Sequence, residues 1–140
     1  MSNNKVIVEQ LFNELMNQKN LSSVEKFLDS NFKQHGFPNS KQGIEGFKEI
    51  LQQFTTAFPD FKVLPESILA EGDSVATRGV CTGTNTGSFM GGPATNKKVT
   101  VSYIDWWQFK NGKAVENWVQ MDMTSMMIQL GLMPVASMED

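Results

Sequence analysis

Two aspartates lie in segments whose side chains alternate as they do in β-strands. Asp122 ends the segment ENWVQMD, in which it shares one face with Trp118 and Gln120. Asp105 lies in SYIDWWQF, in which it shares a face with Trp107. A carboxylate among aromatic residues on the inner face of a sheet is expected only where it is paired, hydrated or used in chemistry. Both aspartates are therefore candidate catalytic groups.

Asp122 fits two interpretations. As a general base, it would be buried beside Trp118, which would raise its pKa and suit it to take a proton from carbon next to a carbonyl. As a helix N-cap, it would accept hydrogen bonds from the amides of Thr124 or Ser125, which would lower its pKa. The residues alone leave both interpretations open.

Asp105 also has two interpretations. If the turn at Asn111-Gly112 pairs its segment with the next one, Asp105 could lie near Asp122 and act as a partner acid. Alternatively, it is an edge residue that forms a salt bridge with Lys113 or another basic group.

The single histidine, His35, lies between two phenylalanines, so it is either a packed, hydrogen-bonded residue or a catalytic one. With one histidine, one cysteine and no close cluster of carboxylates, the sequence predicts no metal site. The sequence also shows no glycine loop of the kind that binds phosphate.

The composition limits the class of protein. The chain has 140 residues, which suits one domain over 1–140, and a net charge of −3, which argues against nucleic-acid binding. The single cysteine, Cys81, allows no intrachain disulfide. The sequence shows neither a signal peptide nor an apolar run long enough for a membrane span, so we expect a cytoplasmic protein.

Helical spacing comes first along the chain and strand alternation follows, which predicts an α+β fold rather than alternating α/β. The helices would pack on a strongly curved antiparallel sheet and leave a cone-shaped cavity. Residues from about 135 are expected to fray. The predicted helices cover 4–18, a segment within 21–32, 43–57 and 124–131, and the predicted strands cover 32–38, 61–73, 74–89, 97–109 and 113–122.

Four stretches, AFPDF, AEGDSVATRGVCTGTNTGSFMGGPATNKKV, NGKAVENWVQMD and QLG, occur in an order and spacing that resemble the SnoaL-like polyketide cyclases and ester cyclases of the nuclear-transport-factor-2-like superfamily. The resemblance covers nearly the whole chain. It implies a cone-shaped fold, a homodimer and a deep apolar pocket. It also implies ring closure by intramolecular aldol condensation without a metal or organic cofactor, with Asp122 as acid and base and His35 matching a family histidine.

The chain departs from this family at two pocket positions. Asn85 and Asp105 stand where the family pattern has histidines. Asparagine can donate and accept hydrogen bonds, but it cannot shuttle a proton near neutral pH. The expected pocket has therefore lost two imidazoles and gained a carboxylate.

The leading hypothesis is an enzyme in which Asp122 moves a proton at carbon in a small, apolar, carbonyl-containing molecule, by aldol-type cyclisation or isomerisation. The enolate oxygen would be held by Asn85, Gln120, His35 or Tyr103, and the pocket would be shaped by Trp107, Trp118, Phe89 and Met90. One alternative is a non-catalytic module that binds a ligand or dimerises. A third possibility, water addition as in epoxide hydrolases, would need an Asp-Arg-Asp relay built on Arg78.

Overall fold

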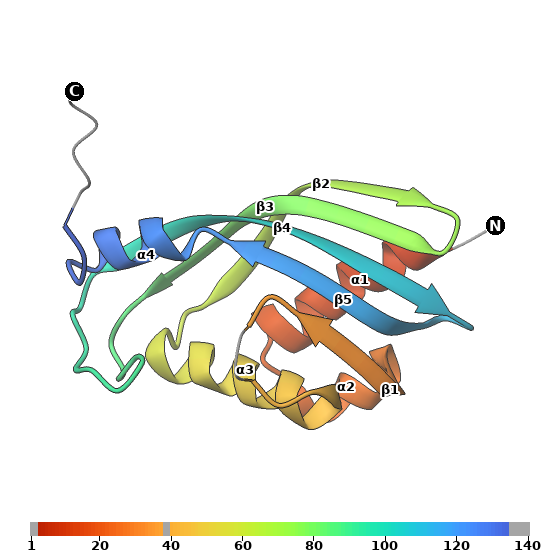
Figure 1. Cartoon of the computed structure of the whole chain (residues 1–140), viewed down its shortest axis with the longest axis horizontal. Coiled ribbons are helices and arrows are strands. Elements are labelled where there is room, and N and C mark those ends of the chain that lie inside the picture. Colours follow the sequence, from red (N-terminus) through yellow and green to blue (C-terminus); the bar gives the residue numbers. More distant parts are fainter. Residues whose placement is uncertain (1–2, 38–39, 135–140) are drawn as a thin grey trace.

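Helices cover one face of a five-stranded sheet in the computed structural model, which describes residues 3–37 and 40–134 (Figure 1). The predicted fraying from residue 135 lies outside the described residues. In chain order, the elements are α1 (Asn4–Leu11), the π-helix η1 (Phe12–Asn17), the 3₁₀-helix η2 (Leu21–Ser23), α2 (Val24–Phe27), β1 (Leu28–His35), α3 (Gly43–Ala57), β2 (Lys62–Glu71), β3 (Ser74–Thr84), β4 (Lys98–Lys110), β5 (Lys113–Met121) and α4 (Met123–Gln129).

The strands lie in the order β1-β5-β4-β3-β2. Neighbouring strands from β2 to β5 are antiparallel, whereas β1 is parallel to β5. The α+β prediction is confirmed, with helices that pack on a curved sheet. The expectation of a wholly antiparallel sheet is corrected at this edge, because β1 and β5 are joined through α3 and three other strands rather than by a hairpin.

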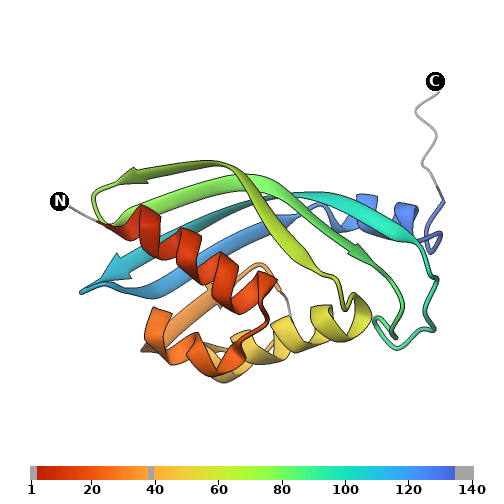
Figure 2. The ribbon, with the colours of Figure 1, turned by 180° about the vertical axis from the view of Figure 1, so that it is seen from behind.

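The helical predictions hold for α3 and for the first segment, which continues from α1 into η1. The segment within 21–32 is helical only as far as Phe27, because Leu28 already adopts extended backbone angles and begins β1. Figures 1 and 2 show α1, α2 and α3 on the same side of the sheet. None of the helices in the described part of the chain is long and apolar enough to cross a membrane.

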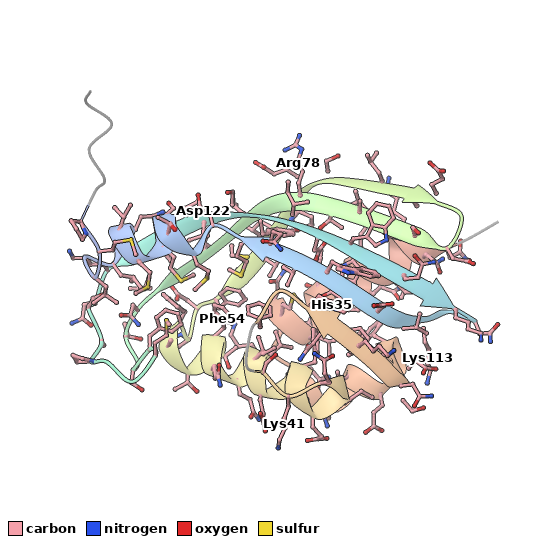
Figure 3. The ribbon with its side chains drawn as sticks, viewed as in Figure 1. His35, Lys41, Phe54, Arg78, Lys113 and Asp122 are labelled. Atoms are coloured by element: carbon pink, nitrogen blue, oxygen red, sulfur yellow. The ribbon has the colours of Figure 1, made fainter. Side chains whose placement is uncertain are left out.

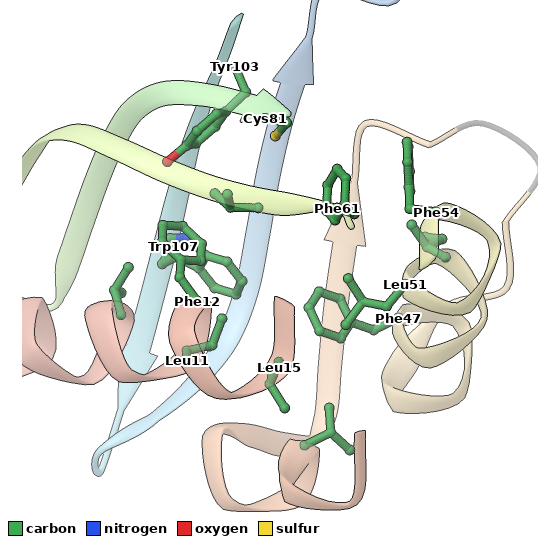
Figure 4. Close-up of a cluster of buried hydrophobic side chains, with 14 of the residues drawn as sticks. Leu11, Phe12, Leu15, Phe47, Leu51, Phe54, Phe61, Cys81, Tyr103 and Trp107 are labelled. Carbon is green, nitrogen blue, oxygen red and sulfur yellow. The ribbon is translucent and has the colours of Figure 1, made fainter. Parts of the chain in front are cut away.

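The core lies between these helices and the inner face of the sheet (Figure 4). Its centre is Trp107 of β4, a nearly fully buried side chain. The ring of Trp107 contacts Phe12 and Phe47 edge-on, with centroids 6.1 and 6.4 Å away, and stacks on Phe32 at 6.4 Å. Aromatic contacts of this kind add to the stabilisation from apolar burial. Helical and strand residues thus meet around one indole.

A β-bulge in β5 decides which of its side chains face the helices. Phe109 of β4 lies opposite Ala114, but the next residue, Gln108, lies opposite Glu116, so Val115 is the extra residue. Because side chains along a strand alternate with a period of two, one inserted residue turns all later ones to the opposite face.

This bulge reverses the sequence-based expectation for the second half of β5. A regular hairpin would place Asp105 opposite Trp118. In the structure, Trp118 lies opposite Trp106 on the outer face, and Asp105 lies opposite Val119. The expectation that Trp118 and Gln120 share the inner face with Asp105 is therefore wrong, although the alternation itself is present.

The outer face of the sheet carries a row of side chains that crosses all five strands. From β1 to β2, the residues that lie opposite one another on neighbouring strands are His35, Trp118, Trp106, Ala76 and Leu69. Trp106 is 47% exposed and Trp118 is 40% exposed. We call these five residues the outer row.

Candidate active site

A small cavity of about 60 Å³ lies between the helices and the inner face of the sheet. Its walls are almost entirely apolar, and it has room for only a few water molecules. Among the described residues that line it, Asp105 supplies the one carboxylate. The cavity is lined by Phe12, Met16, Gln34, Phe37, Phe47, Ile50, Leu51, Phe54, Phe61, Val63, Cys81, Tyr103, Asp105, Trp107, Asn117, Val119 and Met121.

Two side-chain hydrogen-bond donors hold the Asp105 carboxylate. Thr77 Oγ1 lies 2.6 Å from Oδ1, and Trp107 Nε1 donates to Oδ2 over 2.9 Å. Only 5% of the residue is exposed. Burial disfavours the charged form and raises the pKa of Asp105 to about 7, although the hydrogen bonds from Thr77 and Trp107 oppose this shift. The carboxyl group therefore titrates near neutral pH.

Thr77 links Asp105 to Tyr103. Its Oγ1 lies 3.1 Å from the hydroxyl of Tyr103 as well as 2.6 Å from Asp105. A threonine hydroxyl has one proton, so Thr77 can donate to only one of the two at a time. When Asp105 is ionised, Thr77 donates to it and can accept from Tyr103. When Oδ1 of Asp105 carries a proton, the direction of both hydrogen bonds reverses. Thr77 then accepts from Asp105 and can donate to Tyr103.

Two buried amides, Gln34 of β1 and Asn117 of β5, also line the cavity. Gln34 Nε2 donates to the carbonyl of Lys41 over 2.8 Å, and Asn117 Nδ2 donates to the carbonyl of Trp106 over 3.0 Å. Each amide nitrogen carries a second hydrogen. Sequence reasoning missed both residues. Asn117 faces inward only because of the bulge, and Gln34 lies in a segment that was expected to be a short edge strand.

Asp122 lies outside this cavity. It is exposed and is the N-cap of α4, where Oδ1 accepts a hydrogen bond from the amide of Ser125 over 3.0 Å (Figure 3). The structure thus has the capping arrangement that the sequence left open, and it does not bring Asp122 and Asp105 together. The expected placement of Asp122 in the pocket is corrected, because the sheet ends at Met121 and the chain turns into α4.

His35 is on the outer face, with 44% of its side chain exposed. Its Nε2 is 2.6 Å from Oε2 of Glu116, and its ring stacks on Trp118 with centroids 5.1 Å apart. The inward positions at this end of β1 belong to Phe32 and Gln34. The expected placement of His35 in the pocket is therefore corrected, because strand alternation turns it outward.

Asn85, Phe89 and Met90 belong to the connection between β3 and β4, and none of them lines the cavity. Asn85 is buried and organises this connection. Its Nδ2 donates to the carbonyls of Ala57 and Gly87, and its Oδ1 accepts from the amide and hydroxyl of Thr95. These four hydrogen bonds are all made within the protein, and Asn85 does not line the cavity. The expected role of Asn85 in the pocket is therefore corrected.

Of the remaining expected pocket residues, Tyr103 and Trp107 line the cavity, whereas Trp118 and Gln120 face outward. Arg78 is exposed and pairs with Glu66 over 3.4 Å, so the described residues form no Asp-Arg-Asp relay around it. In the described part of the chain, no group of three or more histidine, cysteine, aspartate or glutamate side chains is arranged to hold a metal ion.

Comparisons with known proteins agree with this architecture. Among solved structures, the candidate hydroxylase AclR from Streptomyces galilaeus has a TM-score of 0.85 at 27% identity, covering 96% of this chain and 89% of its own. IdmH, a candidate polyketide cyclase from Streptomyces antibioticus, has a TM-score of 0.80 at 27% identity, covering 93% of this chain and 99% of its own. TsrD from Streptomyces laurentii has a TM-score of 0.84 at 21% identity, covering 95% and 99%.

Comparison with curated protein sequences gives no significant match. The sequence profile of one family, described as SnoaL-like polyketide cyclase, matches residues 6–130. This range includes every described strand and the whole cavity. The chain therefore belongs to the SnoaL-like polyketide cyclase family.

Proposed function

We propose that this protein is a cofactor-independent enzyme in which Asp105 transfers a proton at carbon in a small, apolar carbonyl compound. Membership of the family supports a cyclase or isomerase role on a small molecule. The observation that carries the proposal is the buried carboxyl of Asp105, which faces an apolar cavity with its pKa raised to about 7. A base that titrates near the working pH is the most effective one for general acid–base catalysis.

The reaction begins when ionised Asp105 takes a proton from the carbon next to the substrate carbonyl, which leaves an enolate. In an isomerisation, protonated Asp105 returns the proton at another carbon. In an aldol cyclisation, the enolate carbon forms a bond to a second carbonyl of the same molecule, and Asp105 returns the proton to the resulting alkoxide. Thr77 and Trp107 orient the carboxylate, and the second amide hydrogen of Asn117 or Gln34 is suited to hold the enolate oxygen.

The test is exchange of α-hydrogens for deuterium in a simple ketone, 2-undecanone, followed by NMR in D₂O. We expect the protein to accelerate exchange, and Asp105→Asn to reduce the protein-catalysed rate about 10²- to 10⁴-fold. The asparagine fits the site, since its oxygen can accept from Trp107 while its nitrogen donates to Thr77. The protein-catalysed rate should rise with pH through about 7, as Asp105 ionises.

Asp122→Asn is the matched control, because it makes the same chemical change outside the cavity. It should leave exchange unchanged. If Asp105→Asn exchanged as fast as the natural protein, Asp105 would not be the base. If the ketone bound without any acceleration of exchange, a non-catalytic ligand-binding module would be the better description.

We also propose that two copies of the chain pair through the outer row. Two partly exposed tryptophans, Trp106 and Trp118, lie next to each other across β4 and β5, and Ile104 on the same face is 62% exposed. Aromatic residues of this kind are enriched at the centres of protein interfaces. The outer row therefore supports a homodimer.

A further inference from the structure

The cavity beside Asp105 is too small for a typical ligand. Binding sites for small molecules usually enclose several hundred Å³, whereas this cavity has about 60 Å³. Only a small part of a substrate fits beside the carboxyl group. The rest of the molecule must be held elsewhere, along a path that connects with the cavity.

A surface groove of about 490 Å³ adjoins the cavity. Of the described residues, Phe37, Ile50 and Phe54 line both spaces, so their side chains form a shared wall. The groove runs along α3 and is mostly apolar. It is lined by Gly36, Phe37, Ser40, Lys41, Gly46, Glu49, Ile50, Gln53, Phe54, Phe89, Met90 and Met123.

Phe54 is the centre of the wall between the groove and the cavity. Its ring stacks on Phe61, which lines the cavity, with centroids 5.4 Å apart. It also contacts Phe89, which lines the groove, at 6.1 Å, and Phe37, which lines both, at 6.0 Å. Figure 4 shows Phe54 projecting from α3 next to Phe61. A side-chain rotation at this point would join the two spaces without a change in the backbone of α3.

We propose that the substrate binds across this wall, with its reacting carbonyl end in the cavity and its larger apolar part in the groove, and that Phe54 controls entry and the size of molecule accepted. The shared wall of the two spaces and their volumes support this occupant. The charged groups at the rim, Lys41 and Glu49, pair with each other over 3.2 Å, so the rim favours a molecule without net charge. The identity of the substrate class rests on the proposed function, but the entry route does not.

The chemical modification of Cys81 measures how fast a small molecule enters the cavity. It is the only cysteine, it lines the cavity, and it is buried. The experiment measures the rate at which Cys81 is modified by a small reagent, methyl methanethiosulfonate, and by a larger one, benzyl methanethiosulfonate, with mass spectrometry at fixed pH. No turnover is needed, so the assay does not depend on catalysis by Asp105. Burial, and then the charge of Asp105, raise the pKa of the Cys81 thiol to about 12, so each variant is compared by the ratio of its two reagent rates and by protection relative to its own rate without ligand.

We expect Phe54→Leu to accelerate modification by the benzyl reagent at least tenfold and by the methyl reagent less, because the opening becomes wider. Phe54→Trp should slow both reagents. Phe27→Leu is the matched control, since Phe27 is also buried in the core but lines neither space, and it should leave the ratio of the two rates unchanged. Equal acceleration by Phe27→Leu would mean that Cys81 reacts through general unfolding and would overturn the proposal.

Ligands test the groove itself. The methyl ketones from 2-butanone to 2-undecanone should protect Cys81 with an apparent affinity that increases about threefold to fourfold per methylene until the groove is filled. If short and long ketones protected Cys81 equally, the groove would not be part of the binding site. If Cys81 were modified more slowly at higher protein concentration, the groove would instead be a contact between two copies of the chain. Asp105→Asn should keep the protection, so a failure of the proposed base and a failure of the proposed entry route give different results.

Discussion

Asp105 combines a buried carboxyl group with hydrogen bonds from Thr77 and Trp107 that only partly offset the cost of burying its charge. A pKa near 7 means that the folded protein keeps the proton over a range in which the unfolded chain, with an ordinary pKa of 3.8, has lost it. The folded state therefore binds more protons between these two pH values. The contribution of Asp105 to stability must therefore fall as pH rises through this window and remain lower above it.

This linkage gives a prediction for stability. Asp105→Asn cannot ionise, so it should have about the stability of the natural protein near pH 4 and exceed it above pH 7, by on the order of 4 kcal/mol at 1.36 kcal/mol per pKa unit. Urea unfolding at pH 4.5, 6 and 8 measures the difference. Comparing the two proteins at each pH removes the contribution of other groups, such as Asp60, whose pKa is lowered by hydrogen bonds from Thr84. A difference that did not grow with pH would contradict a raised pKa for Asp105.

The sequence predicted the surroundings of Asp105 better than those of Asp122. Alternation correctly placed Tyr103, Asp105 and Trp107 on one face of β4, and the aromatic residues indicated that this face is buried. Asp122 follows a strand whose end the pattern does not mark, so alternation continued through it. Its carboxyl group had two interpretations that sequence could not separate, because the choice depends on where β5 stops and α4 begins.

At the scale of elements, α4 depends on a short list of contacts. Asp122 caps its first turn, and near its end Gln129 pairs with both the amide and the carbonyl of Thr100 in β4, each over 2.8 Å. A helix of this length is not stable alone and needs such tertiary contacts. The cap and the glutamine, together with the buried side chain of Met126, thus fix α4 at the end of the sheet.

Asp122→Ala should lower the free energy of unfolding by about 1 kcal/mol, because the amide of Ser125 loses its acceptor. Asp122→Ser, which restores a capping oxygen, should recover most of that loss. The measurements are urea unfolding and hydrogen exchange at the amide of Ser125. A loss of ketone exchange in Asp122→Ala at full stability would contradict the capping role and return Asp122 to the catalytic site.

The bulge at Val115 explains the largest error in the sequence-based site. The turn at Asn111-Gly112 correctly predicted the hairpin of β4 and β5. One inserted residue then exchanged Trp118 for Asn117 on the inner face, because every side chain beyond the insertion changes sides. Bulges of this kind depend on how two strands twist together, and no residue type at this position marks one. By contrast, the bounds of α3 follow from its apolar stripe and from Pro59, which prevents the helix from continuing.

At the scale of the whole molecule, the sheet separates two apolar regions for which we propose different uses. Its inner face builds the cavity, and the outer row leaves two tryptophans partly exposed on the other side. Since β4 contributes Asp105 and Trp107 to one face and Ile104 and Trp106 to the other, the same strand would link the candidate active site to the proposed dimer interface. Substitutions on the outer face can therefore test assembly without entering the cavity.

Trp106→Arg should convert the proposed dimer into a monomer at micromolar concentration. A tryptophan at the centre of an interface commonly contributes 2 kcal/mol or more, so its loss should raise the dissociation constant by roughly 30-fold or more. Sedimentation velocity follows the change from twice the chain mass to the chain mass of 15.7 kDa. Val6→Arg is the matched control, because Val6 is 50% exposed but lies on α1, on the helical side. A natural protein that sediments as a monomer, or a dimer that Val6→Arg disrupts as strongly as Trp106→Arg, would contradict pairing through the outer row.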